Sequence, residues 1–494
     1  MTLTVLEPET AAPIEQAPTK PDDCRRVQTA WASLPIERRL LVLRRARHEL
    51  ARAGEQLVDA ISSELVRIRA DSYGAEVLPV LFACKFLERR ARQILKPRRL
   101  GRSGLPLLLA GIDSTVERVP LGIVLIIGPS NYPLFLAGVQ TLQALAAGNA
   151  VVWKPGRGGQ PVAEVFHAAL HRAGLPNGLL RITDESIETT IAELKSRPDK
   201  VFFTGSARAG REVLRIAAEA TIPVVAELSG CDAVVVLESA KLDRVVDALA
   251  FGMRLNGSAT CMAPRRLFLV GKGHEVLVAR LRERFATMDG IDLDQRTRSQ
   301  LRDLVAEAEH DGATLSIDPD AVLIKPLLVL DGWPRMRIAQ ADIFAPVLTV
   351  ILAADADEVV QADKLCPFGL AVTIFGEERA ARALGARLDV GTVVVNDLIV
   401  TTVDPRVPFG GRRGSGFGVT RGSEGLLEMT AVKVTSVRKS GPTLHFEKTS
   451  PTHEHLFRGA IAMSNGTTLR ERLAGIRGLA SAARRLLRKT QEKQ

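Results

Sequence analysis

From Val116 onward, short continuous apolar runs alternate with segments of helical periodicity, and this alternation constrains the fold more than any other feature of the sequence. Runs such as GIVLIIGPS, NAVVWKPG and KVFFTGS have the length and β-branched content of buried parallel strands. The segments between them, such as LFLAGVQTLQALAAG, repeat apolar residues every three or four positions and end on glycine. The pattern predicts an α/β protein with a doubly wound parallel sheet, whose ligand lies at the carboxyl ends of the strands.

The alternation resumes after Gly230 with DAVVVLE, LDRVVDALAFGMRLNG and RRLFLVG, which predicts a second α/β domain of comparable size. Ahead of the first strand, the chain from Asp22 to about Arg98 has a helical pattern throughout. The sequence predicts five segments: a flexible N-terminal arm over 1–20, a cofactor-binding domain over 21–228, a catalytic domain over 229–410, a return to the cofactor domain over 411–440, and a basic tail over 441–494.

Composition and charge exclude several classes of protein. The net charge of +10 is uneven, because residues 441–494 hold ten basic and four acidic side chains. Two Tyr and three Trp are too few for the stacking surface of a nucleic-acid binder. Five scattered cysteines without a CxxC pair predict neither a disulfide framework nor a metal site, and favour a reducing compartment. The first residues resemble no secretory signal, so we expect a protein that is cytoplasmic or peripheral to a membrane.

Four residues whose side chains are suited to catalysis or ligand binding fall at the ends of predicted strands or helices. They would lie along one edge of the sheet. They are Asn131 after GPS, Lys154 in WKP, Glu227 at the end of VVAEL and Cys261 in NGSATC. The nucleotide motif GxGxxG is absent, and its nearest substitute is the run from Gly205 and Ser206 to Gly210. Backbone N–H groups at this helix start can receive a pyrophosphate, or Ser206 is merely an N-cap.

Taken together, these blocks resemble the aldehyde dehydrogenase superfamily. GPSNYPL is similar to the family's GPWNFPL, WKPG to KPSE, FFTGSARAG to FTGS, ELSG to ELGG, DIFAPV to EIFGPV, and PFGGRRGSGFG to the closing PFGG block. The blocks occur in the family's order and the resemblance spans about residues 25 to 440. It implies a Rossmann-like cofactor domain, an α/β catalytic domain and a small oligomerisation arm.

The resemblance also implies a set of catalytic residues. Cys261 would be the nucleophile, because a thiolate adds readily to an aldehyde to form a thiohemiacetal. Glu227 would be the general base that activates water to hydrolyse the resulting thioester. The side-chain amide of Asn131 and the Cys261 backbone N–H would stabilise the oxyanion, although Asn131 also suits a simple turn.

Cofactor contacts carry over from the family less evenly. Lys154 would hydrogen-bond the adenosine ribose, Gly205 and Ser206 would lie at the pyrophosphate, and Asp342 and Phe344 would hold the nicotinamide ribose and ring. Asp342 stands where the family usually has Glu, which shortens that contact by one methylene.

Arg157 departs further, because the family commonly places there a Glu that grips the ribose and repels a 2′-phosphate. A cation reverses that sign or simply points to solvent, so we expect NAD or NADP as cofactor.

The expected substrate pocket is apolar. Tyr132, Phe135, Leu136 and Val139 share one helix face, and Thr260 and Met262 flank the nucleophile. This lining has no Arg or Lys to bind a second carboxylate, which favours an aliphatic or aromatic aldehyde over succinic semialdehyde. Plain core packing of the same residues is the alternative.

Two further segments, the oligomerisation arm and the basic tail, predict what the protein binds besides its substrate and cofactor. In the family, strands near Ser114–Val119 and Ala431–Arg438 would mediate a homodimer or homotetramer. In the tail, Leu469, Leu473, Ile476, Leu479, Ala480, Ala483 and Leu487 trace an apolar stripe among arginines. A basic amphipathic helix of this kind either binds anionic lipid or docks on its own protein.

Two rival functions remain open at this level. One is a relative that transfers the acyl group to coenzyme A or reduces an acyl thioester, which a water-activating Glu227 argues against. The other is a catalytically silent scaffold at a membrane, which the joint presence of Cys261, Glu227 and Asn131 argues against.

Overall fold

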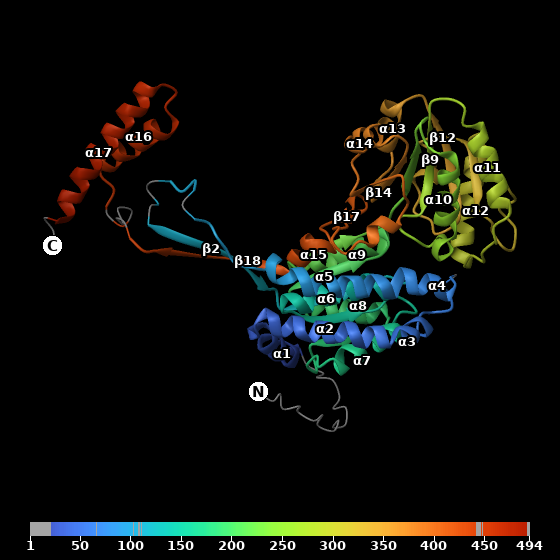
Figure 1. Ribbon diagram of the computed structural model, residues 1–494, viewed down its shortest axis with the longest axis horizontal. Helices are drawn as coiled ribbons and strands as arrows, with labels where there is room; N and C mark the ends of the chain where they lie inside the picture. Colours follow the sequence, from blue (N-terminus) through green and yellow to red (C-terminus); the bar gives the residue numbers. More distant parts are fainter. Residues whose placement is uncertain are drawn as a thin grey trace, which may run out of the picture. The chain divides into compact units, whose positions relative to one another are not determined.

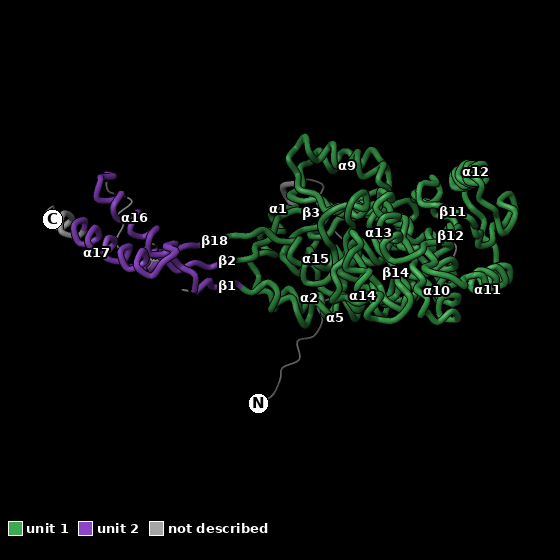
Figure 2. The backbone as a smooth tube through the Cα atoms, turned by 90° about the horizontal axis from the view of Figure 1, so that it is seen from above, with its two compact units in different colours: residues 1–96, 117–433 green, residues 97–116, 434–494 purple. Residues whose placement is uncertain are grey.

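The computed structural model describes residues 21–65, 67–101, 103–106, 109, 111–440, 446 and 448–491. The chain forms two compact units, one of residues 1–96 and 117–433 and the other of residues 97–116 and 434–494 (Figure 2). The predicted N-terminal arm over 1–20 lies outside the described residues. The division into cofactor and catalytic domains stays a prediction, because both parts belong to the larger unit.

The first sheet of the larger unit has six strands in the order β17-β7-β6-β3-β4-β5, and its edge strand β17 is labelled in Figure 1. All its neighbours are parallel except β17, which pairs antiparallel with β7. The chain runs outward from β3 through β4 and β5 and then returns to the other side of β3 as β6. The strand order therefore reverses beside β3, which is the position at which sheets of this kind bind ligands. The bounds are β3 (Ile123–Ile127), β4 (Ala150–Lys154), β5 (Leu180–Ile182), β6 (Lys200–Thr204), β7 (Val224–Glu227) and β17 (Gly416–Phe417).

Helices cover this sheet, and their apolar faces form its core. Trp153 of β4 meets Phe166 edge-on, with ring centroids 5.4 Å apart. The predicted N-terminal helical region is interrupted between Ala60 and Ile68. The bounds are α1 (Pro21–Ser33), α2 (Ile36–Arg52), α3 (Gly54–Asp59), α4 (Arg69–Ser72), the π-helix η1 (Tyr73–Val77), α5 (Leu78–Ile94), α6 (Phe135–Ala147), α7 (Gln160–Arg172), α8 (Ile187–Lys195), α9 (Ala207–Glu219) and α15 (Gly422–Glu428).

The second sheet has seven strands in the order β10-β11-β12-β9-β8-β14-β15, parallel except for β10. Its strands are β8 (Asp232–Val236), β9 (Pro264–Val270), β10 (Thr314–Leu315), β11 (Leu327–Gly332), β12 (Val347–Ala353), β14 (Ala371–Phe375) and β15 (Thr392–Val395). Its helices are α10 (Leu242–Arg254), η3 (Leu255–Ser258), α11 (Glu275–Ala286), α12 (Gln295–His310), η4 (Arg337–Gln340), α13 (Ala356–Asp363), α14 (Glu378–Gly385) and η5 (Val400–Val403). A separate pair, β13 (Phe368–Gly369) and β16 (Arg412–Arg413), is antiparallel.

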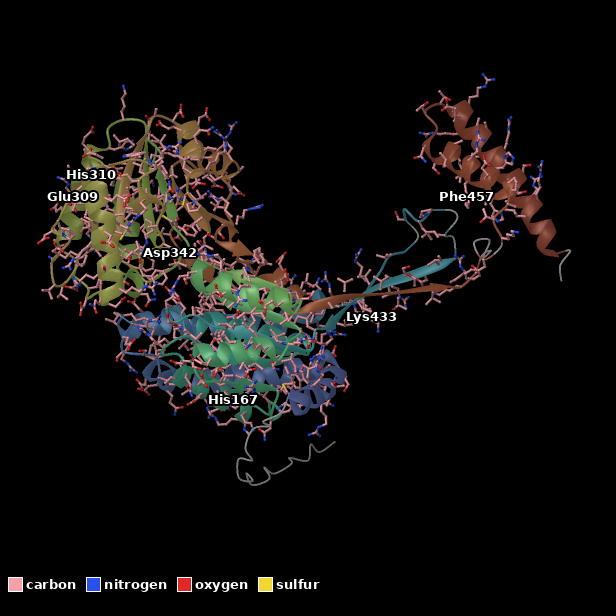
Figure 3. The ribbon with its side chains drawn as sticks, turned by 180° about the vertical axis from the view of Figure 1, so that it is seen from behind. His167, Glu309, His310, Asp342, Lys433 and Phe457 are labelled. Atoms are coloured by element: carbon pink, nitrogen blue, oxygen red, sulfur yellow. The ribbon has the colours of Figure 1, made fainter. Side chains whose placement is uncertain are left out.

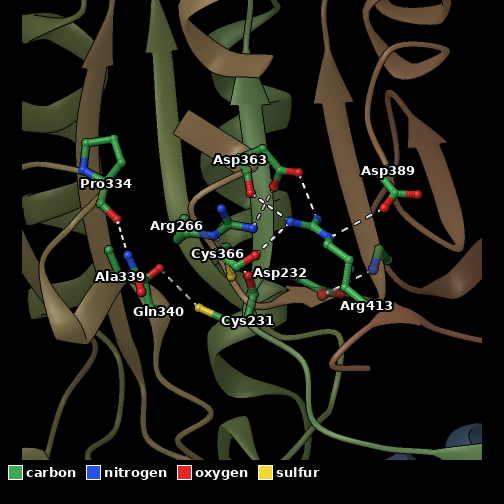
Figure 4. A network of polar contacts seen from close by, with 12 residues as sticks. Cys231, Asp232, Arg266, Pro334, Ala339, Gln340, Asp363, Cys366, Asp389 and Arg413 are labelled. Atoms are coloured by element: carbon green, nitrogen blue, oxygen red, sulfur yellow. Dashed lines mark hydrogen bonds and ion pairs between the residues drawn. The ribbon is translucent and has the colours of Figure 1, made fainter. Parts of the chain in front are cut away.

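A buried charge network joins the second sheet to the chain that returns to the first (Figure 4). Asp363 accepts from Arg266 of β9 and from Arg413 of β16, both at 2.9 Å. Arg266 also donates to the Cys231 carbonyl, directly before β8, at 2.9 Å. Each Asp363 carboxylate oxygen has its own guanidinium partner, so the buried charges are compensated. The network thereby fixes the positions of β9 and the start of β8 relative to β16.

The smaller unit contains strands and a helical hairpin, which is formed by the two helices of residues 451–491. β1 (Arg98–Arg99), β2 (Ile112–Pro120) and β18 (Thr430–Arg438) form a sheet in that order, and the two predicted arm strands lie within β2 and β18.

The tail contains a helix that the sequence analysis did not predict, α16 (Pro451–Asn465), ahead of the expected α17 (Leu469–Gln491). His453 completes a capping box at the start of α16, because its ring accepts the backbone N–H of Ser450.

Candidate active site

Cys261 lies in a tight turn that connects η3 to β9. Asn256, Gly257 and Ser258 have φ angles of 54°, 57° and 61°. Non-glycine residues rarely adopt this left-handed conformation, so the surrounding structure must hold it. The turn places Cys261, half-buried, on the wall of a cavity of about 360 Å³.

The wall of this cavity is mainly apolar. Leu78, Phe82 and Val400 are lining residues that are also exposed, so the cavity opens to solvent past apolar side chains. The residues that line it are Ala70, Asp71, Gly74, Ala75, Leu78, Phe82, Tyr132, Phe135, Leu136, Phe251, Leu255, Thr260, Cys261, Met262, Ile399, Val400, Thr402, Val403, Phe409 and Arg421. The size and lining suit a small or medium apolar molecule.

Most of the predicted pocket residues lie in this lining. Tyr132, Phe135, Thr260 and Met262 are among them, and the Tyr132 hydroxyl bonds the Thr260 hydroxyl at 2.7 Å. Val139 does not line this cavity. It lies one helical turn further along α6, against a void of about 10 Å³. The helix axis carries Val139 away from the nucleophile although the periodicity keeps it on the same face.

The expectation that no Arg or Lys lines the pocket is wrong. Arg421 belongs to the lining, and only 6% of its surface is exposed. Its guanidinium lies 4.3 Å from the ring centroid of Phe409 and 5.3 Å from that of Phe135. Arg421 is 160 positions from Cys261 in the sequence, so no local pattern could place it there.

Asn131 is tied to the nucleophile turn. Its side-chain Nδ2 donates to the Ala259 carbonyl at 2.9 Å, two residues before Cys261. Its own carbonyl accepts from Asn256 at 2.9 Å and from Arg67 at 3.0 Å. These bonds fix the amide beside the turn while one of its two N–H donors remains for another acceptor.

A buried ion pair that sequence analysis missed supports this arrangement. Arg67 and Glu76 meet at 2.7 Å, with 1% and 0% of their side chains exposed. The other Glu76 oxygen accepts the backbone N–H groups of Leu134 and Phe135, at 3.2 and 2.6 Å, at the start of α6. Glu76 therefore caps the helix that follows Asn131, and Arg67 joins this cap to the Asn131 carbonyl.

Glu227 is buried at the end of β7 and accepts a hydrogen bond from the Thr420 hydroxyl. Burial raises the pKa of the carboxyl, whereas the Arg421 charge and the hydroxyl groups of Thr420 and Thr204 oppose that rise. The residue is not part of the cavity lining, but Thr420, which bonds it, directly precedes the lining residue Arg421.

More of the surrounding groups raise the pKa of the Cys261 thiol than lower it. Burial raises its pKa to about 12, the carboxyl groups of Asp232 and Glu227 add to the rise, and Arg421 opposes it. The resting thiol is therefore protonated near neutral pH, and turnover requires a partner that removes its proton.

Another buried arginine that sequence analysis missed connects the nucleophile turn to the segment of Asp342 and Phe344. Arg265 donates to the Ser258 carbonyl at 2.6 Å and to the Ala345 carbonyl at 2.7 Å. Asp342 is largely buried, with its position marked in Figure 3, and Phe344 is exposed. Burial raises the pKa of Asp342, and its bond to Ser229 and the charge of Arg265 oppose the rise.

The remaining predicted cofactor residues lie at the carboxyl ends of the first sheet. Lys154 is buried at the end of β4, and burial lowers its pKa against the charges of Glu185 and Asp184. Gly205 and Ser206 follow β6, and the Ser206 oxygen accepts from the Ala209 N–H at the start of α9. Ser206 thus acts as an N-cap, and its own hydroxyl proton is still available to a ligand.

Arg157 points to solvent and pairs with Glu64 at 3.3 Å. Because 81% of the Arg157 side chain is exposed, this is a surface ion pair, and such pairs contribute little to the stability of a fold.

Comparisons with known proteins agree with this geometry. The model of the aldehyde dehydrogenase family matches residues 8–435. The chain belongs to the aldehyde dehydrogenase family. The predicted family, and with it an oxidoreductase that acts on aldehydes with NAD or NADP, is confirmed.

Three relatives illustrate the range of this family. A 4,4′-diapolycopene aldehyde oxidase of Methylomonas sp is 30% identical over 84% of this chain and 80% of its own. A succinate-semialdehyde dehydrogenase [NADP(+)] of Deinococcus radiodurans is 30% identical over 82% of this chain and 86% of its own. The structure of a Mycobacterium tuberculosis aldehyde dehydrogenase complexed with NAD+ is 25% identical over 85% of this chain and 90% of that one, with a TM-score of 0.78.

We predict that Gly230→Ala inactivates this aldehyde dehydrogenase without unfolding it. A Cβ at Gly230 would lie 2.4 Å from the Cys261 carbonyl oxygen, so the nucleophile turn must shift. Displacement of a reacting group by about 1 Å costs about 100-fold in rate. Turnover and thermal unfolding would be measured side by side, with Gly174→Ala, where no atom lies within 4 Å but φ is 93°, as a control for glycine loss. Full activity of Gly230→Ala would contradict the prediction.

Proposed function

We propose that this aldehyde dehydrogenase oxidises an apolar aldehyde to its carboxylic acid through a thioester on Cys261. The observation that carries the proposal is the placement of Cys261 on the wall of the apolar cavity, with Asn131 bonded to the same turn and Glu227 buried and bonded to Thr420, the residue before the lining residue Arg421. The three residues come from sequence segments more than 30 positions apart.

In the first step, the Cys261 thiol loses its proton to water, the thiolate sulfur bonds to the aldehyde carbon, and the carbonyl oxygen becomes negative. The free N–H of Asn131 and the backbone N–H of Cys261 are the donors for this oxygen, and fixed donors in a water-poor site stabilise such a charge strongly. The bonds from Asn131 to Ala259 and from Arg67 and Asn256 to Asn131 hold the first donor in place before substrate arrives.

The residues at the sheet edge fit a dinucleotide. The buried Lys154 ammonium and the start of α9 supply positive charge, and the exposed face of Phe344 and the carboxyl of Asp342 stand on the segment fixed by Arg265. Lys154 would hold the adenosine ribose, Gly205 and Ser206 the pyrophosphate, and Asp342 and Phe344 the nicotinamide end, with Arg157 outside these contacts. Bound NAD or NADP supplies the hydride acceptor that oxidation of the thiohemiacetal to the thioester requires.

Hydrolysis of the thioester then needs an activated water. Glu227 takes a proton from water, the water oxygen bonds to the acyl carbon, and the carbon–sulfur bond breaks to return the Cys261 sulfur. A carboxyl whose pKa is raised by burial is a stronger base than an exposed one once it is ionised, which suits this role.

The lining supports an aliphatic or aromatic aldehyde. The exposed apolar side chains of Leu78, Phe82 and Val400 in the cavity lining favour the entry of a lipophilic molecule. The Methylomonas relative is named a 4,4′-diapolycopene aldehyde oxidase, and this name agrees with the proposal.

The test is reduced-cofactor absorbance at 340 nm with purified protein and aldehydes of increasing chain length, NAD and NADP separately, and Cys261→Ala as control. Turnover that vanishes in the variant and rises with chain length is the expected result. Turnover only with added coenzyme A would contradict the hydrolytic route, and preference for succinic semialdehyde would contradict the apolar substrate.

A homo-oligomer is part of the proposal. β18 is the edge strand of its sheet, and Val434 and Val437 are exposed on it. An edge strand with exposed β-branched residues is a template for pairing with a second chain. Analytical ultracentrifugation of the full chain would show a dimer or tetramer, and a monomer at micromolar concentration would contradict this.

The helical hairpin of the smaller unit supports peripheral binding to anionic lipid. The predicted stripe of α17 divides: Leu479 and Ala483 pack with Leu456 of α16, whereas Leu469, Leu473 and Ile476 are exposed. Leu487 lies outside the residues whose side chains are described.

On α16, Phe457 and Ile461 are 48% and 62% exposed, and Figure 3 marks Phe457 on the hairpin. Exposed apolar residues on a basic hairpin are the features of an interfacial helix. Among the described residues, no helix is long and apolar enough to cross a membrane.

We predict that the full chain sediments with vesicles that contain phosphatidylserine and not with phosphatidylcholine vesicles. Basic side chains near an anionic surface contribute about 1 kcal/mol each. Phe457→Asp together with Ile461→Asp would abolish sedimentation, whereas Phe446→Asp, outside the hairpin, would not. Equal binding to both lipids, or a stable dimer through the hairpin instead, would contradict the prediction.

A cytoplasmic setting belongs to the same proposal and is supported by five free cysteines.

A further inference from the structure

Arg421 is a buried cation that was not among the predicted site residues and has no role in the reaction steps described above. It precedes α15, and its φ of 62° and ψ of 174° are a conformation that a residue with a side chain rarely adopts. Its Nη1 donates to the Thr402 carbonyl at 2.5 Å, and its Nε is buried without a hydrogen-bond partner in the described part of the chain. A strained, buried and incompletely bonded guanidinium is unfavourable for the fold itself, which indicates a function.

Arg421 is not part of a direct ion pair. No carboxylate oxygen of the described residues lies within salt-bridge distance of it, its Nη1 bonds a backbone carbonyl, and the rings of Phe135 and Phe409 cover it. It therefore brings a positive charge into a mainly apolar cavity, in which the acidic lining residue Asp71 is already paired with Arg254. In such low-dielectric surroundings a fixed charge acts over longer distances than in water.

Two groups that the proposed reaction needs as anions lie within reach of this charge. Arg421 lowers the pKa of Glu227 against burial, and the neighbouring Thr420 bonds the same carboxyl. It also lowers the pKa of the Cys261 thiol, while Asp232, Glu227 and Asp342 raise it. Arg265 is the other cation that acts on this thiol, but its guanidinium is committed to Ser258 and Ala345.

We propose that Arg421 is a positioning residue that stabilises the anionic forms of Glu227 and Cys261 inside the apolar cavity and favours anions beside the nucleophile. The inference rests on the proposed function where it concerns Glu227 as the base. The cation serves both halves of the reaction, because the first needs a thiolate and the second needs a carboxylate. It also attracts the carboxylate that forms as product.

The test uses alkylation of Cys261, which needs neither cofactor nor aldehyde. Iodoacetamide and iodoacetate transfer similar groups to the thiolate, but only iodoacetate is negative, so the ratio of their rates reports the charge of the cavity. The variants are Arg421→Gln, which removes the charge, and Arg421→Lys, which keeps it. Arg412→Gln is the matched control, because Arg412 is an exposed arginine nine positions earlier that pairs with Asp389 at the surface.

We expect Arg421→Gln to lower the iodoacetate-to-iodoacetamide ratio about tenfold and to slow iodoacetamide itself at fixed pH, since removal of an opposite charge shifts a nearby pKa by about one unit or more. Arg421→Lys would stay near wild type, and so would Arg412→Gln. A merely structural role would slow both reagents equally and would not be restored by Lys.

The second readout is the pH dependence of aldehyde hydrolysis. Loss of the cation leaves burial of Glu227 unopposed by charge, so its pKa rises further and the limb of the profile where turnover increases with pH moves up by about one pH unit in Arg421→Gln. An unchanged alkylation ratio in Arg421→Gln with normal aldehyde turnover in wild type would overturn the inference and leave the proposed function intact. A changed ratio in a wild-type protein that oxidises no aldehyde would overturn the proposed function alone.

Discussion

Replacement of Glu227 by Gln leaves one rapid burst of reduced cofactor per active site and then slows steady turnover by about 100- to 10,000-fold. The side-chain amide of this variant cannot accept a proton from water, so the Cys261 thioester accumulates after the first oxidation. Thr420, which donates to the carboxylate, can equally donate to the amide oxygen, so the site should keep its shape. Stopped-flow absorbance at 340 nm separates the burst from the steady state.

Hydroxylamine provides the control for this experiment. It attacks a thioester without a base, so its addition should restore turnover of Glu227→Gln but not of Cys261→Ala. Glu219→Gln, on the exposed surface of α9, is the matched carboxyl control and should behave as wild type. Steady turnover of Glu227→Gln at the wild-type rate would show that another group activates the water.

Removal of Arg67 destabilises the protein by about 3–5 kcal/mol, because it leaves Glu76 as an unpaired buried charge. The loss should also reduce activity, since Arg67 holds the Asn131 carbonyl and Glu76 caps α6 directly after it. Urea unfolding of Arg67→Met followed by circular dichroism measures the change in unfolding free energy.

A double-mutant cycle with Glu76→Gln isolates the ion pair in that prediction. Arg67→Met with Glu76→Gln should be less destabilised than the sum of the two single variants, because neither charge is then left alone. Arg92→Met, which breaks an exposed pair with Glu37, should cost about 1 kcal/mol or less. Additive single effects would show that Arg67 and Glu76 do not depend on each other.

The periodicity of the sequence determined the first sheet in detail. The runs GIVLIIGPS, NAVVWKPG and KVFFTGS became the adjacent strands β3, β4 and β6, because a strand buried on both faces is apolar at nearly every position between its ends. The helix α16 escaped prediction for the opposite reason. Three of its fifteen residues are buried, and its start is capped by the His453 ring, which accepts the Ser450 N–H and resembles no common cap in sequence.

The sequence by itself also placed Cys261, Glu227 and Asn131 as candidates, since each stands in a local motif at the end of a predicted strand or helix. Tertiary structure alone decided what surrounds them. Arg421 reaches the cavity from 160 positions away, and Arg67 reaches Asn131 across 64 positions. Local motifs specify backbone geometry over a few residues, whereas burial brings together charges whose separation along the chain carries no signal. The chemistry of the nucleophile is therefore legible in the sequence, but the electrostatic environment that governs its ionisation is set by the fold.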